Sequence, residues 1–585
     1  MSTYKITSLC LAVSLLAFAA PSGAQSTEII GENLKKSLSE ELSDLIDTSK
    51  EATSRFAARR EARKAARAAS DLLNSYGYFS PEIETGVTLE VPYEPRLRID
   101  TGPQYTVSDL RIEYLGNPPD AADITAIEAE RDLRASEAAI PERLIVEQKR
   151  LERAYRDLGY ADITVSEPDL LANRENSSVV VTFEVDTGYP VRLGTVQLEG
   201  AEETRPEFVD RLRTFETGDL YTPAALARLN RRLSSTRHFN DVAVNLSDVD
   251  PEDPSAPRNV VIELEERPRN TLALGASFAT DQGAGGLIEW TRWNLTGRAD
   301  PLRLIVQASQ IEQSGTMDWR LPHFPKADRD VSLRASLFNE DTDAFNRSGF
   351  SIGGNYERIG PQYLVLTLGG EYDIVQERGE AEERVLQTVT LTGTAAIDKS
   401  DDLLDPRSGW RARLSTVPGL TFGDDANQFL RTSLQASTYL PIGASKRLVL
   451  ANRVEFGSVF GAPLLELPVE QRFFSGGGAS VRGFGFQEVG PRDAEGNPTG
   501  GRSLFESSAE LRFQATRRFA GAVFVDAGSV TEDTLPQFTD IRLGAGLGLR
   551  VSTPAGPIRL DVAVPLDRTE FDRDVQIYFS IGQAF

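Results

Sequence analysis

Apolar and polar residues alternate along the second half of the chain, from about residue 270 to the C-terminus. Leu272, Leu274 and Ala276, for example, would point to one face of a strand, and the residues between them to the other. Gly, Asp, Asn and Pro separate these segments, which are about ten residues long. At about 20 residues per strand and connection, residues 270–585 predict roughly 16 strands.

The first half mixes helical and strand patterns, and the mixture occurs three times. Each copy reads as a strand, two helices and two further strands. The clearest copy has a strand at 195–200, a helix from Pro206, a helix capped by Thr222 and beginning with Pro223, and strands at 241–249 and 259–266. The second copy has strands at 107–116, 161–167 and 179–185 and helices at 121–133 and 142–158, and a weaker copy runs from Glu28 to Ile99. We predict α+β modules followed by an all-β barrel.

Similar turns precede the second strand of each copy. They read Tyr76-Gly77-Tyr78-Phe79, Leu158-Gly159-Tyr160-Ala161 and Thr236-Arg237-His238-Phe239, about 80 residues apart. This spacing predicts tandem modules at 25–101, 102–187 and 188–267, with the barrel at 268–585.

The N-terminus predicts export. Lys5 precedes an apolar run from Ile6 to Ala20, and Pro21-Ser22-Gly23-Ala24 then supplies the small residues of a cleavage site. We expect residues 1–24 to be a signal peptide, with an uncleaved signal anchor as the alternative. Cleavage would remove Cys10, the single cysteine of the chain. In an exported chain, long stretches of alternation are typical of an outer-membrane barrel, and a soluble periplasmic sandwich or propeller is the alternative.

Composition excludes several other functions. The formal net charge is −24, which argues against nucleic-acid binding because phosphates require clustered Lys and Arg. Two His and one Cys cannot build a Cys/His zinc site, and we expect no metal, cofactor or catalytic residue. Beyond the N-terminal segment no run of about 18 apolar residues occurs, which excludes helical membrane spans.

One glycine-rich segment, Gly476-Gly477-Gly478-Ala479-Ser480-Val481-Arg482-Gly483-Phe484, falls within the barrel half. It is not a phosphate-binding loop, because neither Gly-Lys-Ser/Thr nor a helix follows, and an ordinary hairpin loop is the alternative. In the strand at 521–528, the outward alternation of Val523 and Val525 turns Phe524 and Asp526 into the barrel. A carboxylate there needs a cation, and the Arg482 guanidinium on an inward-folded loop can bind it with two hydrogen bonds.

Val481-Arg482-Gly483-Phe484, together with Phe524, Asp526 and Gly528, resembles the superfamily of POTRA-bearing outer-membrane barrels, which includes the BamA, TamA and two-partner transporter families. The repeats resemble POTRA (polypeptide-transport-associated) modules. Residues 229–236, 521–526 and 553–565 are similar to the TamA family in particular, as is the number of modules. Arg237-His238 departs from the Gly-Tyr or Gly-Trp pair that is usual at that turn.

The resemblance implies a barrel of about 16 strands whose first and last strands pair poorly. It implies that Arg482 binds Asp526 and so holds the inward loop against the barrel wall. It also implies that β-rich clients such as autotransporters add strands at the seam between residues 271–279 and 576–585. The gate residues of this seam are Leu272, Leu274, Gly582 and Phe585. Gly582 either weakens the last strand or marks a bend at a barrel corner.

The implied function is that of an outer-membrane protein assembly or translocation factor without enzymatic activity. It would act in the bacterial outer membrane, with its modules in the periplasm, on unfolded outer-membrane proteins. Its partners would be outer-membrane lipid and a TamB-like periplasmic protein anchored in the inner membrane. A dedicated two-partner-type secretion pore and a general BamA-like insertase are the alternatives.

Three further segments have weaker functional interpretations. A hydrolase is a distant possibility, because Gly349-Phe350-Ser351-Ile352-Gly353 fits a nucleophile-elbow pattern but has strand-like neighbours. The acidic segment 398–409 favours a turn over a calcium loop, since it lacks the glycine and bidentate Glu of an EF-hand. The charge cluster at 377–384 indicates an exposed loop tip.

A stripe of arginines follows the predicted long helix of the first module. Arg55, Arg59, Arg63 and Arg67 are spaced four residues apart, with Arg60 and Lys64 beside them. In so acidic a protein this stripe can dock an acidic partner or membrane headgroups. A solvated helix face is the alternative.

Overall fold

The computed structural model describes residues 3–6, 27–30, 36–45, 54–89, 91–279, 283–360, 364–378, 383–424, 426–443, 447–538, 540–553 and 556–581. Most of the expected signal peptide therefore lies outside the described residues. The chain divides into two compact units, one of residues 1–197, 214–229 and 244–262, and the other of residues 198–213, 230–243 and 263–585. Two α+β modules and part of a third belong to the first unit, and the rest of the third module and the barrel belong to the second.

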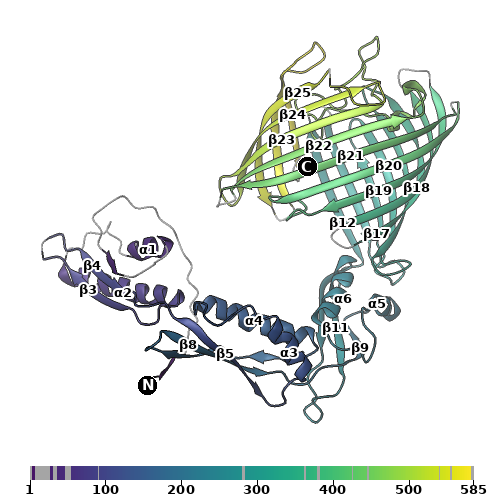
Figure 1. Ribbon diagram of the computed structural model, residues 1–585. Coiled ribbons are helices and arrows are strands. Elements are labelled where there is room, and N and C mark those ends of the chain that lie inside the picture. The colour runs from purple at the N-terminus through teal and green to yellow at the C-terminus, as the bar shows by residue number, and fades with distance from the viewer. Residues whose placement is uncertain are drawn as a thin grey trace. The chain divides into compact units, whose positions relative to one another are not determined.

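The three modules each begin with a strand and two helices in the predicted order, and two strands follow in the first and third modules and three in the second (Figure 1). The first contains β2 (Thr27–Ile30), α1 (Lys36–Ser43), α2 (Arg55–Ser75), β3 (Glu82–Val87) and β4 (Pro95–Asp100). The second contains β5 (Thr106–Leu115), α3 (Ala121–Ala129), α4 (Pro141–Asp157), β6 (Thr164–Val165), β7 (Asp169–Asn173) and β8 (Ser178–Asp186). The third contains β9 (Leu193–Glu199), α5 (Pro206–Leu212), α6 (Pro223–Ser235), β10 (Phe239–Leu246) and β11 (Arg258–Glu266). A short strand, β1 (Thr3–Ile6), pairs with β7.

Each module places its last strand in the middle of the sheet. The orders are β2-β4-β3, β7-β8-β5 and β10-β11-β9. The turn before the second strand needs a left-handed residue, which is Gly77 (φ 85°), Gly159 (φ 99°) or Arg237 (φ 61°). Arg237 thus adopts the backbone conformation of the two glycines, at a steric cost that glycine does not have.

The second module differs from its prediction at two places. The strand expected at 161–167 is instead the two-residue β6 followed by β7 at 169–173. Pro168 separates them because it has no N–H to donate to a ladder. Helix α3 ends at Ala129, and Leu133, expected within the helix, is buried in the core of the module beyond it.

Helix α4 shows why these sequences form amphipathic helices. Pro141 stands in its first turn, where its missing N–H has no helical partner to lose. Leu144, Leu151 and Tyr155 follow at helical spacing and are buried together with Val179 of β8.

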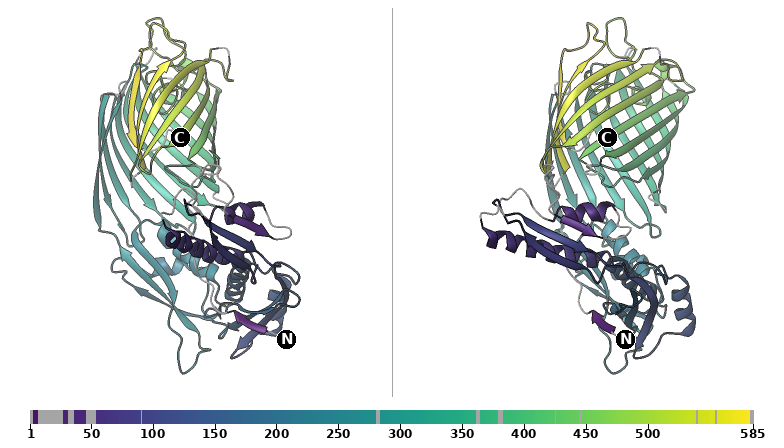
Figure 2. Two further views of the ribbon diagram at one scale, coloured as in Figure 1. Left: turned by 90° about the vertical axis from the view of Figure 1, so that its left-hand side faces the viewer. Right: turned by 60° about the vertical axis from the view of Figure 1, so that its left-hand side comes forward.

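Sixteen antiparallel strands close into a barrel, which confirms the predicted fold class (Figures 1 and 2). They are β12 (Asn270–Ala279), β13 (Gly283–Arg292), β14 (Leu302–Ala308), β15 (Glu312–Leu321), β16 (Arg329–Asp341), β17 (Asn346–Ile359), β18 (Leu364–Arg378), β19 (Arg384–Asp398), β20 (Gly409–Gly423), β21 (Gln428–Ile442), β22 (Leu448–Phe460), β23 (Ser503–Gln514), β24 (Phe519–Thr531), β25 (Arg542–Thr553), β26 (Gly556–Pro565) and β27 (Gln576–Ile581).

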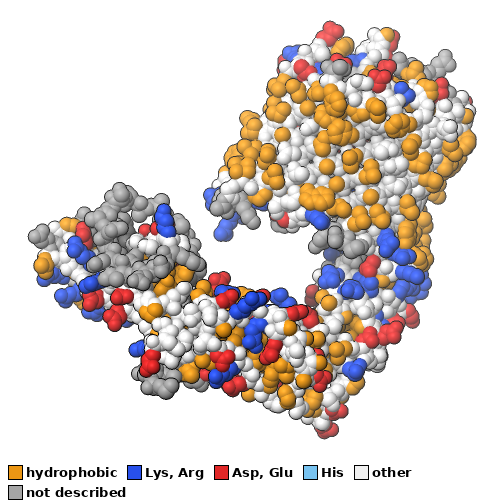
Figure 3. All heavy atoms as spheres, viewed as in Figure 1, with side chains coloured by type: hydrophobic (Ala, Val, Ile, Leu, Met, Phe, Trp, Pro, Cys, Tyr) orange, Lys and Arg blue, Asp and Glu red, His pale blue; other side chains and the backbone are white. Residues whose placement is uncertain are grey.

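The alternating pattern separates the two faces of the barrel wall. Val523 and Val525 are about half exposed on the outside, whereas Phe524 and Asp526, which alternate with them, are each 1% exposed. Apolar side chains consequently cover much of the outer wall (Figure 3). In the described ranges, no helix combines the length and apolar character needed to cross a membrane.

Candidate functional site

The loop between β22 and β23, residues 461–502, carries the glycine-rich segment. It also contains two short 3-10 helices, η2 (Leu464–Glu466) and η3 (Val469–Gln471). Val481, Arg482 and Phe484 are each at most 1% exposed, so this part of the loop packs into the barrel and is not a solvent-exposed hairpin.

Arg482 and Asp526 meet in a bidentate ion pair. Arg482 Nε donates to Asp526 Oδ2 at 2.7 Å and Nη2 donates to Oδ1 at 2.9 Å. The backbone N–H of Arg482 also donates to Asp526 Oδ2, at 3.0 Å. The guanidinium carbon lies 3.4 Å from the centre of the Phe524 ring, so the cation stacks on an aromatic face.

Three further groups bind the same guanidinium. Arg482 Nη1 lies 2.7 Å from Glu510 Oε2 and 3.2 Å from Asp561 Oδ2, and Nη2 lies 3.3 Å from Ser508 Oγ. Reasoning from the sequence missed the role of these three residues. The alternation of β23, which turns Ser508 and Glu510 inward, is the signal that could have found two of them.

The carboxylates of this network differ in the number of arginines with which they pair. Glu510 also pairs with Arg512 and Arg550, and Asp561 also pairs with Arg550 and Arg559. Within the described part of the chain, Asp526 pairs with Arg482 alone. Burial opposes the charge of Arg482, but its hydrogen bonds to Asp526 and the surrounding carboxylates raise the pKa of Arg482, which therefore stays charged.

Glycines let the loop approach the wall closely. A Cβ at Gly544 would collide with the carbonyl oxygen of Arg482, and one at Gly528 would lie 2.5 Å from Val481 Cγ2. Gly483 has φ 107°, a region that glycine adopts without strain. The wall and the loop are thus complementary in shape as well as in charge.

The tip of the loop is also tied to the last strand. The hydroxyl of Tyr578, on β27, donates to the carbonyl of Phe484 at 2.7 Å and accepts the N–H of Gly483 at 3.2 Å. Tyr578 is 2% exposed. The loop therefore holds the strand that forms one side of the barrel seam.

In the described part of the chain, the seam between the first and last strands is short. Among the described residues, β12 and β27 pair at two positions, Phe278↔Phe579 and Ala279↔Tyr578, whereas β12 and β13 pair at ten. These two pairs lie within the predicted seam between residues 271–279 and 576–585, and the rest of that seam stays a prediction because residues 582–585 lie outside the described part of the chain. Leu272 and Leu274 are exposed, and on the β13 side they lie opposite Trp290 and Ile288, while Gly582 and Phe585 lie outside the described residues.

A second set of contacts anchors the other end of the loop on β17 to β19. Arg384 donates to Glu377 Oε1 at 2.7 Å and to the carbonyls of Leu465 and Leu467 at 2.8 Å each. Arg347 of β17 pairs with Glu470. Glu377 and Arg384 at the two ends of this charge cluster are buried, and the loop carbonyls accept hydrogen bonds from Arg384, whereas Arg378 and Glu383 are exposed and residues 379–382 lie outside the described residues.

Within the barrel unit, the last turn of α6 binds the connection between β15 and β16. Arg232 Nη2 lies 2.6 Å from Asp328 Oδ2, and Nε lies 3.0 Å from Oδ1. His323 Nδ1 accepts the N–H of Asp328 at 3.0 Å, so the proton is on Nε2, which lies 2.9 Å from the carbonyl oxygen of Arg232. Burial lowers the pKa of His323 and keeps the imidazole neutral.

Two other predicted candidates have structural explanations. Ser351 lies inside β17, and its Oγ is 2.6 Å from Ser336 Oγ, so the strand-to-helix turn of a nucleophile elbow is absent there. Asp401 Oδ1 accepts the backbone N–H groups of Arg407 and Ser408, at 2.8 and 3.0 Å, which is a turn and not a cation site.

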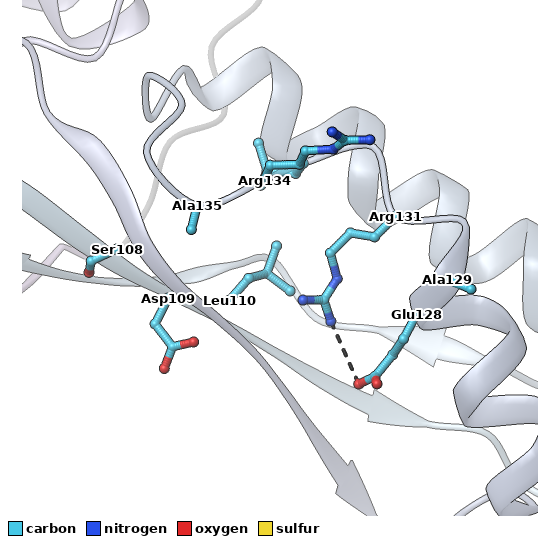
Figure 4. A pocket seen from close by; sticks show the side chains of 9 residues that line it. Ser108, Asp109, Leu110, Glu128, Ala129, Arg131, Arg134 and Ala135 are labelled. Carbon is cyan, nitrogen blue, oxygen red and sulfur yellow. Dashed lines mark ion pairs between the residues drawn. The ribbon is translucent and has the colours of Figure 1, made fainter.

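A hollow of about 370 Å³ lies in the second module between β5 and the segment after α3 (Figure 4). Arg131, Arg134, Asp109 and Glu128 line it, and Arg131 Nη2 is 3.7 Å from Glu128 Oε1. Because two cations balance two anions, the hollow favours neither charge in a ligand.

The predicted docking stripe lies on α2. Arg59, Arg63 and Arg67 are exposed to solvent. Arg55 is also exposed, and its guanidinium lies 5.6 Å from the centre of the Tyr93 ring.

Comparison with known proteins identifies the family. Residues 294–585, about half of the chain, match the Omp85 superfamily domain. Outer membrane protein assembly factor BamA of Neorickettsia risticii is 25% identical over 437 residues, which cover 70% of this chain and 57% of that protein. The BamA of Nitratidesulfovibrio vulgaris is 26% identical over 465 residues, covering 75% of this chain and 57% of that protein.

Among solved structures, BamA from Haemophilus ducreyi lacking POTRA domains 1–3 has a TM-score of 0.64 at 18% identity, and covers 81% of this chain and 99% of that chain. This likeness supports the fold of α+β modules and a barrel. The chain spans little more than half the length of the curated relatives, 57% of each. By its barrel, this chain belongs to the Omp85 superfamily, as a bacterial outer-membrane protein whose N-terminal modules lie in the periplasm.

Proposed function

We propose that this chain is an outer-membrane protein assembly factor that adds strands of unfolded client proteins to the edge of its own barrel. The seam carries the proposal: two residue pairs join β12 to β27 in the described residues, against ten between β12 and β13. The relatives named as assembly factors support it. The chain is not an enzyme.

The energetics favour opening at the seam. With about one hydrogen bond per residue pair and about 1 kcal/mol net for each, the described pairs between β12 and β27 contribute roughly 2 kcal/mol, and those between β12 and β13 roughly 10 kcal/mol. Inside a bilayer an unpaired strand edge is unfavourable because no water satisfies its N–H and C=O groups. A client strand that pairs with the opened edge removes this penalty, which is β-augmentation.

The subtype is a finer question. Three modules and the segments at 229–236 and 553–565 support a TamA-type factor for clients such as autotransporters, with a TamB-like partner. The relatives from Neorickettsia and Nitratidesulfovibrio are both BamA proteins, so the general insertase is the better supported of the two. A dedicated secretion pore for one exoprotein is the third candidate.

A disulfide across the seam tests the mechanism. The paired positions Phe278 and Phe579 would carry cysteines in the double variant F278C/F579C, because antiparallel partners have Cα separations suited to a disulfide. We expect client insertion by reconstituted protein to stop on oxidation and return on reduction. The matched control, L274C/I288C, links β12 to β13 without crossing the seam and should stay active. Full activity of the oxidised seam variant would refute insertion through the seam.

Depletion followed by outer-membrane proteomics tests the client range. Loss of barrels in general would identify a BamA-type insertase, and loss of a small subset such as autotransporters a TamA-type factor. Loss of a single exoprotein would identify a dedicated pore. Unchanged levels of all clients would contradict the assembly function.

A further inference from the structure

Helix α2 of the first module has one face against its sheet and a basic face toward solvent. The buried positions are Ala58, Ala62, Ala65, Ala69 and Leu73. At about 100° per residue, Phe56, Arg60, Arg63 and Arg67 fall within an arc of about 60° on the opposite side. Arg59 and Lys64 flank this arc. Arg60 therefore belongs to the centre of the stripe, and Arg55 to its edge beside Tyr93.

The cations on this face have no acidic partner among the described residues. In the ranges that the structure describes, no carboxylate forms an ion pair with the five cations Arg59, Arg60, Arg63, Lys64 and Arg67. The long helix of the second module differs, because on α4 Arg150 pairs with Glu147 at 2.8 Å and Arg156 with Glu152 at 3.8 Å. On α4 every cation has an acid three or four residues away, whereas on α2 this spacing occurs for Lys64 and Arg67, with Glu61 and Asp71, but not for Arg59, Arg60 or Arg63.

Large apolar side chains project beside the basic face. Leu89 is 82% exposed, Phe56 78% and Val91 75%, while the highest value for a large apolar side chain in the described barrel is 74%, at Leu274. Leu89 and Val91 lie in the turn between β3 and β4, and Tyr93 of the same turn lies 5.6 Å from the guanidinium of Arg55 at the start of α2. The apolar turn thus adjoins the end of α2 that carries Phe56.

We propose that this face of the first module docks on the surface of a phospholipid bilayer that carries anionic headgroups. Phe56, Leu89 and Val91 would enter the headgroup region, and the cations of α2 would bind lipid phosphates. The cations extend over about 12 Å along the helix, which suits a planar charged surface better than a pocket. The exposed apolar residues favour lipid over an acidic protein, because apolar tips beside basic residues are typical of interfacial anchors.

The test uses the full chain, reconstituted in nanodiscs of neutral phosphatidylcholine. Binding to separate vesicles is measured by flotation, with vesicles of phosphatidylcholine alone or with about 30% phosphatidylglycerol, which supplies the anionic surface. The variant R63E/R67E reverses two charges of the stripe. The matched control, K149E/R153E, reverses two exposed charges at the same spacing on α4.

We expect the native chain to bind the anionic vesicles and to lose binding as salt is raised. R63E/R67E should weaken binding about 25-fold, from about five-fold for each cation, and the control less than two-fold. Phe56→Ser should weaken it about ten-fold, whereas Val146→Ser, at an exposed site on α4, should not. Equal binding by the stripe and control variants would overturn the proposal, as would equal binding to neutral vesicles or binding to an acidic protein without binding to vesicles.

Discussion

Replacing Arg482 by Met removes the guanidinium but keeps a long, unbranched side chain. Asp526 would then be a buried carboxylate without a cation, because in the described residues its ion pairs go to Arg482 alone. Removing one partner of a buried pair costs about 3–5 kcal/mol, and we expect the free energy that keeps the loop inside the barrel to fall by this amount. A second change, Asp526→Asn, removes the uncompensated charge and should restore about 2 kcal/mol. Glu510→Gln in the same background should not, because Arg512 and Arg550 depend on that carboxylate.

Limited trypsin digestion of the reconstituted protein measures how often the loop opens. Arg472 is buried and donates to the carbonyl of Thr499 at 3.1 Å, so it becomes a cleavage site when the part of the loop that carries Arg482 and Thr499 leaves the barrel. A loss of 3–5 kcal/mol raises the open population, and with it the cleavage rate, by roughly a hundred- to several-thousand-fold. Mass spectrometry identifies the fragments, and the four tryptophans, all within 268–585, show by fluorescence that the barrel stays folded.

Two results would refute this reasoning. Cleavage of the Arg482→Met variant at the native rate would mean that the ion pair does not hold the loop. Equal rescue by Asp526→Asn and Glu510→Gln would mean that Arg482 stabilises these carboxylates equally, and that Asp526 does not depend on Arg482 more than Glu510 does.

Further predictions concern single residues. The pKa of His323 is lowered from about 6.5 by burial, so the neutral imidazole stabilises the folded state fully above pH 6.5, and this contribution is lost as pH falls through the folded pKa. In urea unfolding, the His323→Gln variant, whose uncharged side chain can make both hydrogen bonds, should lose less stability than the native chain between about pH 7.5 and pH 5, a range that spans the ordinary imidazole pKa of about 6.5; an equal loss would exclude His323 as the cause. Arg237→Gly should stabilise the third module by about 0.5–1 kcal/mol, because the backbone angle φ of 61° favours glycine. Urea unfolding followed by circular dichroism at the helical band measures this change, and destabilisation would contradict the prediction. Tyr578→Phe removes both hydrogen bonds to the loop tip and should lower the free energy of loop opening by about 2 kcal/mol. The rate of trypsin cleavage at Arg472 should rise accordingly, and an unchanged rate would show that the loop is held elsewhere.

Alternation along the strands predicted much of the barrel because every side chain on a strand must face either outward or inward. It placed Asp526 inside the wall, and the same rule applied to β23 would have found Glu510. Proline chemistry explains the displaced strand of the second module, where Pro168 interrupts the ladder.

Other features could not be predicted from periodicity. The loop at 461–502 has no repeating pattern, and its path depends on partners that are distant in sequence, such as Glu377 and Arg384. The length of the seam also depends on register, and any even shift of two alternating strands keeps the same faces outward. The pairing at Phe278↔Phe579 therefore needed the structure.

The two anchors of the loop have a consequence for the permeability of the membrane. One end of the loop follows β27 through Tyr578, and the other is held on β17 to β19 through Arg384. If β27 moves away from β12 to admit a client strand, as the proposed function requires, the half of the loop on the opposite wall can keep its contacts. Under the proposed function, part of the loop at 461–502 would therefore stay inside the barrel while the seam opens, so that insertion of a client would not require a leak of ions.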